Sequence, residues 1–190
     1  MESWPSQEGA VAYVCDDQDA LHKDHQGRRL SIMELIDTVR NLLAEPGNAI
    51  RLLGLAGIGK TRLVQALFDK AIGNNPLDPA KAMYADNANQ PNPPPIEVAL
   101  RFGVEKRPAI LIVDNCPAEL HQRLAEQVQR KGSSVSVLTV EHDIRDGDAE
   151  TGSYFLLNPA QPFVIAHLVH QTNPKLSDIN IRQICDFAGG

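Results

Sequence analysis

Apolar and polar positions alternate along the chain in a way that predicts strands separated by helices. The segment 109–113 is an uninterrupted apolar run, and the mainly apolar segments 49–55 and 135–140 also have the length of buried strands. Shorter segments at 81–85 and 154–157 are expected to form two more strands. Between these runs, apolar residues recur at helical spacing. Helices are accordingly expected over 31–45, 62–72, 96–104, 117–131, 162–171 and 177–188. Such alternation is typical of a parallel sheet that is covered by helices on both faces.

Turn and capping residues mark where these elements begin and end. Ser31 and Glu34 have the spacing of a capping box at the start of the first helix. The segment 87–95 is rich in Asn and Pro, so we expect a loop without regular structure there. We divide the chain into a poorly defined N-terminal segment, an α/β domain and the beginning of a helical subdomain, which we expect to be truncated because its last helix still needs a packing partner. The bounds of these parts are 1–26, 27–159 and 160–190.

Residues 54–61 carry the clearest chemical signal in the sequence. They read Gly-Leu-Ala-Gly-Ile-Gly-Lys-Thr, which is the spacing of a P-loop. Its glycines let the backbone N–H groups surround phosphate oxygens, and the helix that follows directs its N-terminus at the same anion. Lys60 is expected to reach the β- and γ-phosphates, and the Thr61 hydroxyl is expected to bind Mg²⁺. An apolar strand before the loop and an amphipathic helix after it are the context that this motif requires.

A P-loop needs an acidic partner at the end of another buried strand. Asp114 follows the apolar run 109–113, so we expect its carboxylate to hold the magnesium ion together with Thr61. A third polar contact is expected from the strand 135–140 or the loop after it. Thr139, Glu141 and Arg145 are the options for this contact, and the sequence does not choose among them.

Net charge, hydrophobicity and cysteine content limit the partners and the cellular compartment that we expect. The 190 residues carry a formal net charge of -6, which disfavours general nucleic-acid binding because that needs a basic surface. No apolar stretch is long enough to span a membrane, and the N-terminus lacks the apolar core of a signal peptide. Three cysteines at no metal-like spacing favour a reducing compartment. We therefore expect a cytoplasmic protein.

The order of these motifs resembles the STAND class of P-loop ATPases, which includes the nucleotide-binding domains of plant disease-resistance proteins and apoptotic adaptors. Gly27 and Arg28 are similar to the family's element before the first helix. The P-loop, the acidic strand end at Asp114, the strand 135–140 and the apolar segment 155–159 follow in the family's order. The resemblance implies a three-layer α/β fold with the strand order 5-1-4-3-2 of AAA+-like ATPases, followed by a small helical subdomain.

The same resemblance implies bound ATP or ADP with Mg²⁺ and assigns roles to particular residues. Nucleotide contacts are implied for Arg28, Gly54, Gly57, Ile58, Gly59, Lys60, Thr61, Arg62 and Arg145. Catalytic roles are implied for Lys60, Asp114, Asn115 and Glu141, and metal binding for Thr61 and Asp114. As partners, it implies other domains of a longer chain and a nucleotide-dependent oligomer.

Asn115 departs from the pattern of many related ATPases, which place a second acid after the magnesium-binding aspartate. An amide can position a water molecule but cannot accept its proton, so we expect slow hydrolysis, or Glu141 acting in its place. The favoured hypothesis is a slow regulatory ATP/ADP switch. An AAA+-type ATPase subunit and a nucleotide-binding module without turnover remain as alternatives. A small-molecule kinase is disfavoured, because the segment 141–152 is acidic and carries one arginine instead of an arginine-rich lid.

Overall fold

A computed structural model describes residues 22–142, 153–159 and 161–188, which form a mixed α/β fold. The strands are β1 (His22–Asp24), β2 (Arg29–Leu30), β3 (Ala49–Leu53), β4 (Ala82–Asp86), β5 (Ala109–Asp114), β6 (Val135–Glu141) and β7 (Ser153–Leu156). The helices are α1 (Ile32–Ala44), α2 (Lys60–Ala66), α3 (Pro95–Glu105), α4 (Ala118–Val128), α5 (Pro162–Thr172) and α6 (Asp178–Ala188). Short 3₁₀ turns lie at η1 (Pro79–Lys81) and η2 (Asn87–Asn89).

The strands form one mostly parallel sheet in the order β2-β1-β7-β3-β6-β5-β4. This order differs from the expected one, because β1 and β2 add an antiparallel hairpin at the β7 edge. The remaining strands are parallel and lie in the order β7-β3-β6-β5-β4, which is 5-1-4-3-2 when β3 is counted as the first strand. The strand at His22–Asp24 also gives structure to part of the segment that the sequence left poorly defined.

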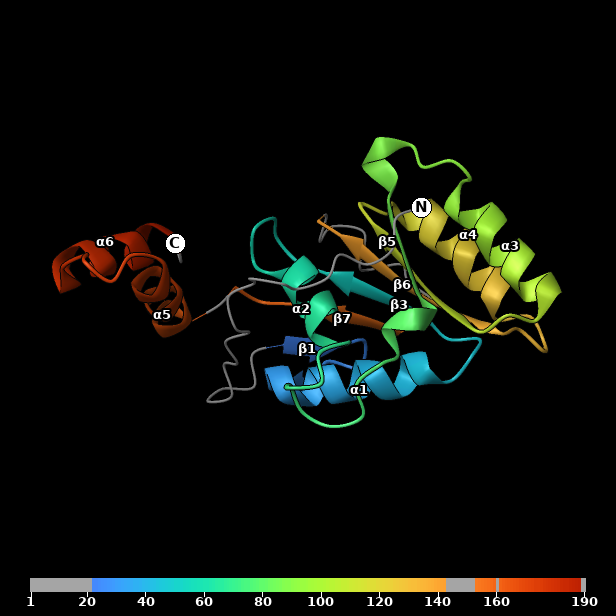
Figure 1. Ribbon diagram of the computed structural model, residues 1–190, viewed down its shortest axis with the longest axis horizontal. Coiled ribbons are helices and arrows are strands. Elements are labelled where there is room, and N and C mark those ends of the chain that lie inside the picture. The colour runs from blue at the N-terminus through green and yellow to red at the C-terminus, as the bar shows by residue number, and fades with distance from the viewer. Residues whose placement is uncertain (1–21, 143–152, 160, 189–190) are drawn as a thin grey trace.

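Each face of the sheet is covered by a pair of helices (Figure 1). On one face, α1 and α2 pack on side chains such as Ile50, Leu52 and Ile112. On the other face, α3 and α4 pack on Leu111, Val137 and their neighbours. Alternate residues of β3, β5 and β6 therefore enter different cores, as the period of two in a strand requires.

The strand register brings the carboxyl ends of the parallel strands to one edge. Leu53 of β3 is in register with Glu141 of β6, and Val113 of β5 is in register with Thr139. The residues that follow β3, β5 and β6 therefore leave the sheet side by side. The carboxyl edge of a parallel α/β sheet is where ligands bind in folds of this kind.

Two local elements differ from the sequence prediction. The helix α2 ends at Ala66, although the apolar spacing predicted helix as far as residue 72. Carbonyl groups beyond it bond to the buried side chain of Arg40, so the chain leaves the helix in turns. The segment 87–95 was expected to lack regular structure, but Asp86 accepts from the backbone N–H of Ala88 and starts η2.

The capping box predicted at the start of the first helix is present. Ser31 Oγ accepts from the backbone N–H of Glu34 at 3.2 Å, and the Glu34 carboxylate accepts from the backbone N–H of Ser31 at 2.8 Å.

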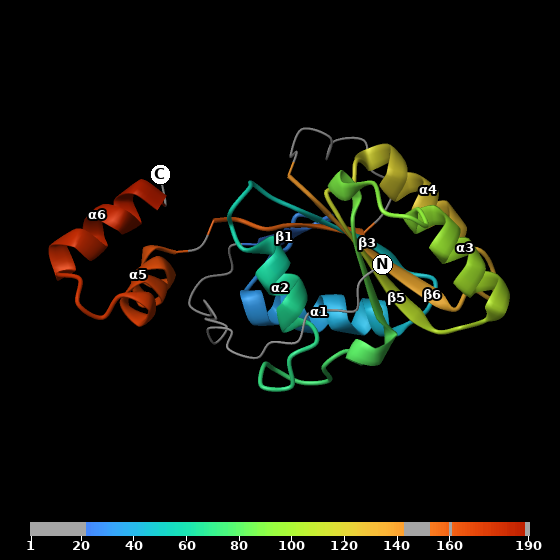
Figure 2. The same cartoon turned by 45° about the horizontal axis from the view of Figure 1, so that its top comes forward.

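Helices α5 and α6 pack on each other and lie to one side of the α/β body in both views (Figures 1 and 2). Among the described residues, none of the helices is long and apolar enough to cross a membrane.

Candidate functional site

The P-loop joins the end of β3 to the start of α2, as its flanking sequence predicted. Gly54 has φ +154°, and a Cβ there would lie 2.4 Å from Ile58 Cδ1 and 2.7 Å from the carbonyl oxygen of Leu157. Gly59 has φ +95° and occupies the N-cap position of α2 in a left-handed conformation. Gly57 lies between them, and a Cβ on it or on Gly59 would meet no atom within 4 Å. The loop backbone is thus in close contact with Leu157 at Gly54, whereas the space beside Gly57 and Gly59 is free.

Lys60 is buried at the first turn of α2, with 4% of its surface exposed. Its Nζ donates to the carbonyl oxygens of Gly54 at 2.7 Å and Leu55 at 2.6 Å. Burial lowers the pKa of the ammonium group, and the nearby carboxylates of Asp114 and Glu141 oppose that shift. The P-loop therefore holds a cation against its own carbonyl groups, and this ammonium must leave them to contact a phosphate.

Thr61 and Asp114 lie together, as the sequence predicted for a metal pair. Thr61 Oγ1 donates to Asp114 Oδ2 at 3.4 Å, and the Tyr84 hydroxyl of β4 donates to the same oxygen at 3.2 Å. The other carboxylate oxygen, Oδ1, accepts from the backbone N–H of Asn115 at 2.9 Å. Hydroxyl and carboxylate oxygens suit Mg²⁺, which commonly binds one or two protein groups and completes its shell with phosphates and water. Within the described residues, no group of three or more His, Cys, Asp or Glu side chains could hold a metal alone.

Asn115 directly follows Asp114, and both its side chain and its backbone carbonyl form hydrogen bonds. Its φ of +51° is left-handed, a conformation that asparagine tolerates better than most residues. Its Nδ2 donates to Asp86 Oδ1 at 2.7 Å, and its Oδ1 lies 2.8 Å from His142 Nε2. Its backbone carbonyl accepts from Asn87 Nδ2 at 3.3 Å. One residue therefore connects the carboxyl ends of β4, β5 and β6.

Glu141 ends β6 and is half-buried. Its carboxylate accepts from the backbone N–H of His142 at 2.7 Å, and its charge acts on the nearby Lys60. Among the three options for a third contact, Glu141 is therefore one whose carboxylate lies near Lys60. Thr139 is fully buried, and its Oγ1 lies 2.7 Å from His121 Nδ1, so its hydroxyl faces α4. Arg145 lies outside the described residues.

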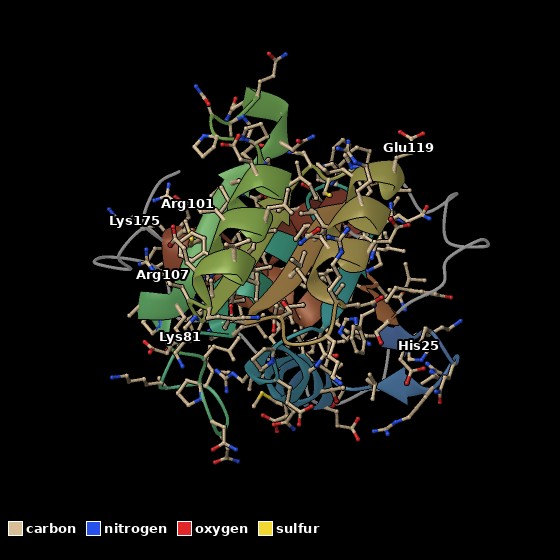
Figure 3. The ribbon with its side chains drawn as sticks, turned by 90° about the vertical axis from the view of Figure 1, so that its right-hand side faces the viewer. His25, Lys81, Arg101, Arg107, Glu119 and Lys175 are labelled. Atoms are coloured by element: carbon tan, nitrogen blue, oxygen red, sulfur yellow. The ribbon has the colours of Figure 1, made fainter. Side chains whose placement is uncertain are left out.

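Two further arginines of the predicted nucleotide site contact Glu34 and Gln65 in the structure. Arg28 lies in the turn between β1 and β2, at the end of β1 opposite the P-loop edge, and pairs with Glu34 at 3.9 Å. Its neighbour His25 lies at this outer edge of the molecule (Figure 3). Arg62 donates to Gln65 Oε1 at 2.7 Å along its own helix.

The sequence did not reveal a buried polar cluster on the face of β3 that α4 covers. Arg51 of β3 is fully buried on the face that α4 covers, and its positive charge acts on both His121 and Cys116. Burial, helped by Arg51, lowers the pKa of His121 to about 4. Burial raises the pKa of the Cys116 thiol to about 12, so the thiol stays protonated and is a packing group. The signal was available, since an arginine in the centre of a predicted buried strand needs a polar neighbourhood.

Comparisons with known proteins support the fold. No protein-family model matches the chain, and no curated protein matches it. Its fold is similar to that of a Signal Transduction ATPase with Numerous Domains (STAND) from Pyrococcus horikoshii, a protein with a tetratricopeptide repeat sensor, with a TM-score of 0.50 and 13% identity. That similarity covers 82% of this chain and 27% of the other.

A second solved structure is more distant. A chain in the HORMA:CdnC:Trip13 complex of E. coli MS115-1 has a TM-score of 0.46 and 11% identity, over 82% of this chain and 67% of that one. Identities this low concern the architecture and not the role of any residue. The architecture is a P-loop-like α/β fold with its polar residues gathered at the carboxyl edge of the sheet.

Proposed function

We propose that this chain is the Mg²⁺-dependent nucleotide-binding domain of a regulatory ATPase of the STAND type, and that it binds ATP and ADP. The observation that carries the proposal is the 3.4 Å contact between Thr61 Oγ1 and Asp114 Oδ2, from residues 53 positions apart in the sequence. A glycine-rich turn that occurred by chance would have no reason to lie against an acidic residue at the end of another buried strand. The pair gives the P-loop the partner that its chemistry requires.

The proposed binding mode uses groups that are already at the site. Backbone N–H groups of the open part of the loop, around Gly57 and Gly59, bind phosphate oxygens. Lys60 exchanges the carbonyl oxygens of Gly54 and Leu55 for the β- and γ-phosphates. Thr61 and Asp114 would hold the magnesium ion, which neutralises phosphate charge when it is bound.

The regulatory part of the proposal is supported by the fold alone. The Pyrococcus horikoshii protein is described as a signal-transduction ATPase with many domains and a repeat sensor, and the similarity covers 27% of it. By analogy, this chain would switch between ATP- and ADP-bound arrangements, and partner domains or a nucleotide-dependent oligomer would respond to the difference.

Titration calorimetry with ATP and ADP tests the binding step. Lys60→Ala removes the cation that contacts the phosphates, so we expect affinity for both nucleotides to fall by about 10²-fold, and binding of ATP to weaken when Mg²⁺ is chelated. Lys70→Ala is the matched control, because Lys70 is exposed just beyond the same helix, and its affinity should equal that of the wild type. Equal affinity in Lys60→Ala and wild type would refute the assignment.

A nucleotide-binding module without turnover is a second candidate. It is favoured by one observation, the amide of Asn115 in the position of the expected acid. Single-turnover hydrolysis of ATP separates the two candidates, since the module would bind Mg·ATP and return it unchanged.

A further inference from the structure

His142 lies at the centre of the site, although the sequence did not single it out. It follows Glu141, which is in register with Leu53 on the neighbouring strand β3. His142 is therefore level with Gly54, where the P-loop begins. Strand β6 also lies between β3 and β5, so His142 stands between the P-loop and the Asp114 strand end. A side chain in this place is close to where the terminal phosphate of a bound nucleotide would lie.

A chain of hydrogen bonds fixes which nitrogen of His142 carries the proton. The Asp86 carboxylate can only accept, so the group that lies 2.7 Å from its Oδ1 is the Asn115 NH₂. That orientation leaves the Asn115 oxygen facing His142, and an amide oxygen can also only accept. His142 Nε2, at 2.8 Å, must then be the donor. In the neutral ring, Nδ1 is left with a lone pair, and in the described part of the chain no hydrogen bond engages it.

We propose that His142 is the general base that the second acid provides in related ATPases, with Asp86 and Asn115 as positioning residues. Asn115 cannot accept a proton. Because its amide bonds to both Asp86 and His142, it can hold the imidazole in one orientation. The hydrogen bonds select one tautomer of a neutral imidazole, and the strand order places this residue near the site where the terminal phosphate would lie. This inference rests on the proposed function, because it presupposes a bound ATP.

The reaction step balances without a further reactant. The oxygen of a water molecule attacks the γ-phosphorus and forms a new P–O bond. The bond between the γ-phosphorus and the β–γ bridging oxygen breaks, and its electron pair leaves with ADP. The water proton passes to Nδ1 of His142, and the imidazolium then releases it to solvent. The Glu141 carboxylate accepts from the backbone N–H of His142, and the Asp86 carboxylate accepts from the same Asn115 amide that His142 contacts.

Single-turnover hydrolysis of Mg·ATP by the full chain, measured beside ADP affinity, tests the role. His142→Gln keeps a donor for Asn115 but cannot accept a proton. We expect its ADP affinity to stay within about twofold of wild type and its hydrolysis rate to fall by about 10²-fold or more. His170→Gln is the matched control, since His170 is exposed on α5. It should hydrolyse ATP at the wild-type rate.

Two further readouts separate a base from a structural side chain. A general base must be unprotonated to act, so the wild-type rate should change with pH in a way that the His142→Gln rate does not. Free imidazole should restore part of the rate to His142→Gly, because His142 is exposed and leaves an accessible space. Circular dichroism of each variant verifies that it is folded.

The outcomes distinguish this inference from the proposed function. A His142→Gln rate equal to the wild type, a wild-type rate that rises towards acidic pH, or nucleotide binding without hydrolysis would overturn the role of His142 and leave nucleotide binding in place. Absence of nucleotide binding by the wild type would overturn the proposed function itself.

Discussion

His121 shows how one buried residue makes the stability of this protein depend on pH. It lies on α4 with 7% of its surface exposed and its Nδ1 2.7 Å from Thr139 Oγ1. Burial, together with the charge of Arg51, lowers its pKa from 6.5 to about 4. The folded state therefore keeps His121 neutral at a pH where the unfolded chain binds a proton. Stability is fully present above pH 6.5 and is lost as the pH falls from 6.5 towards 4.

Replacing His121 should remove this part of the pH dependence. Between about pH 7.5 and about pH 4.5, the free energy of unfolding of the wild type should lose roughly 2 to 3 kcal/mol through His121 alone. His121→Gln, which cannot titrate, should lose that much less over the same interval. Urea unfolding at the two pH values measures the difference. The exposed His170→Gln should follow the wild type, and an equal loss in His121→Gln would show that His121 is protonated in the folded protein.

The early end of α2 at Ala66 shows how a side chain from a distant part of the sequence can limit the length of a helix. Arg40 of α1 is buried, and its guanidinium donates to the carbonyl oxygens of five residues that end α2 or follow it. These acceptors are Ala66, Leu67, Asp69, Ile72 and Asn74, at 2.6 to 2.9 Å. Burial lowers the pKa of Arg40, and Asp37 and Asp69 oppose the shift. The arginine thus binds carbonyl groups at and beyond the C-terminal end of α2, the helix that begins at Lys60 of the P-loop.

Arg40→Met should destabilise the protein strongly, because it leaves several buried carbonyl groups without a donor. We expect a loss of about 4 kcal/mol in the free energy of unfolding, measured in urea. Arg101→Ala is the control. Arg101 lies on the outer surface of α3 and pairs with Glu105, so its replacement should cost less than about 0.5 kcal/mol (Figure 3). A loss below about 1 kcal/mol in Arg40→Met would mean that water replaces the guanidinium.

At the scale of the whole molecule, the α5–α6 pair differs from the α/β body in how its apolar residues are used. Val164, Ile181 and Cys185 are buried, and Cys185 Sγ lies 3.3 Å from the carbonyl oxygen of Pro162, which connects the two helices. Large apolar side chains on the same helices stay exposed, including Phe163, Leu168, Ile179, Ile184 and Phe187. The pair therefore has a small core of its own and adds little to the cores that hold the sheet.

A chain that ends at Asn158 should accordingly keep the α/β fold. We expect its urea unfolding, followed by circular dichroism, to remain cooperative and its free energy of unfolding to change by less than about 1 kcal/mol. Binding of a hydrophobic dye should decrease, because the exposed apolar residues of α5 and α6 are removed. Loss of the cooperative transition would instead show that α5 and α6 support the sheet.

The sequence predicted the parallel strands and the P-loop because both are local signals. The apolar run 109–113 and the glycine spacing of 54–61 can be read without knowing what lies next to them. Contacts between distant segments could not be found in this way. The end of α2 depends on Arg40, the β1–β2 hairpin depends on an available edge of β7, and the place of His142 depends on its register with β3. The position of Arg28 depends on the same hairpin, since its motif does not reveal at which end of the hairpin it lies.

The tight packing at Gly54 gives the P-loop a mechanical connection. The same residue, Leu157, leaves no room for a Cβ at Gly54 and donates its backbone N–H to the carbonyl oxygen of Leu53 at 2.8 Å. Leu157 directly follows the last residue of β7. The first glycine of the P-loop is therefore in direct contact with the residue that follows β7, and a movement of the loop that needed more space at Gly54 would also displace Leu157.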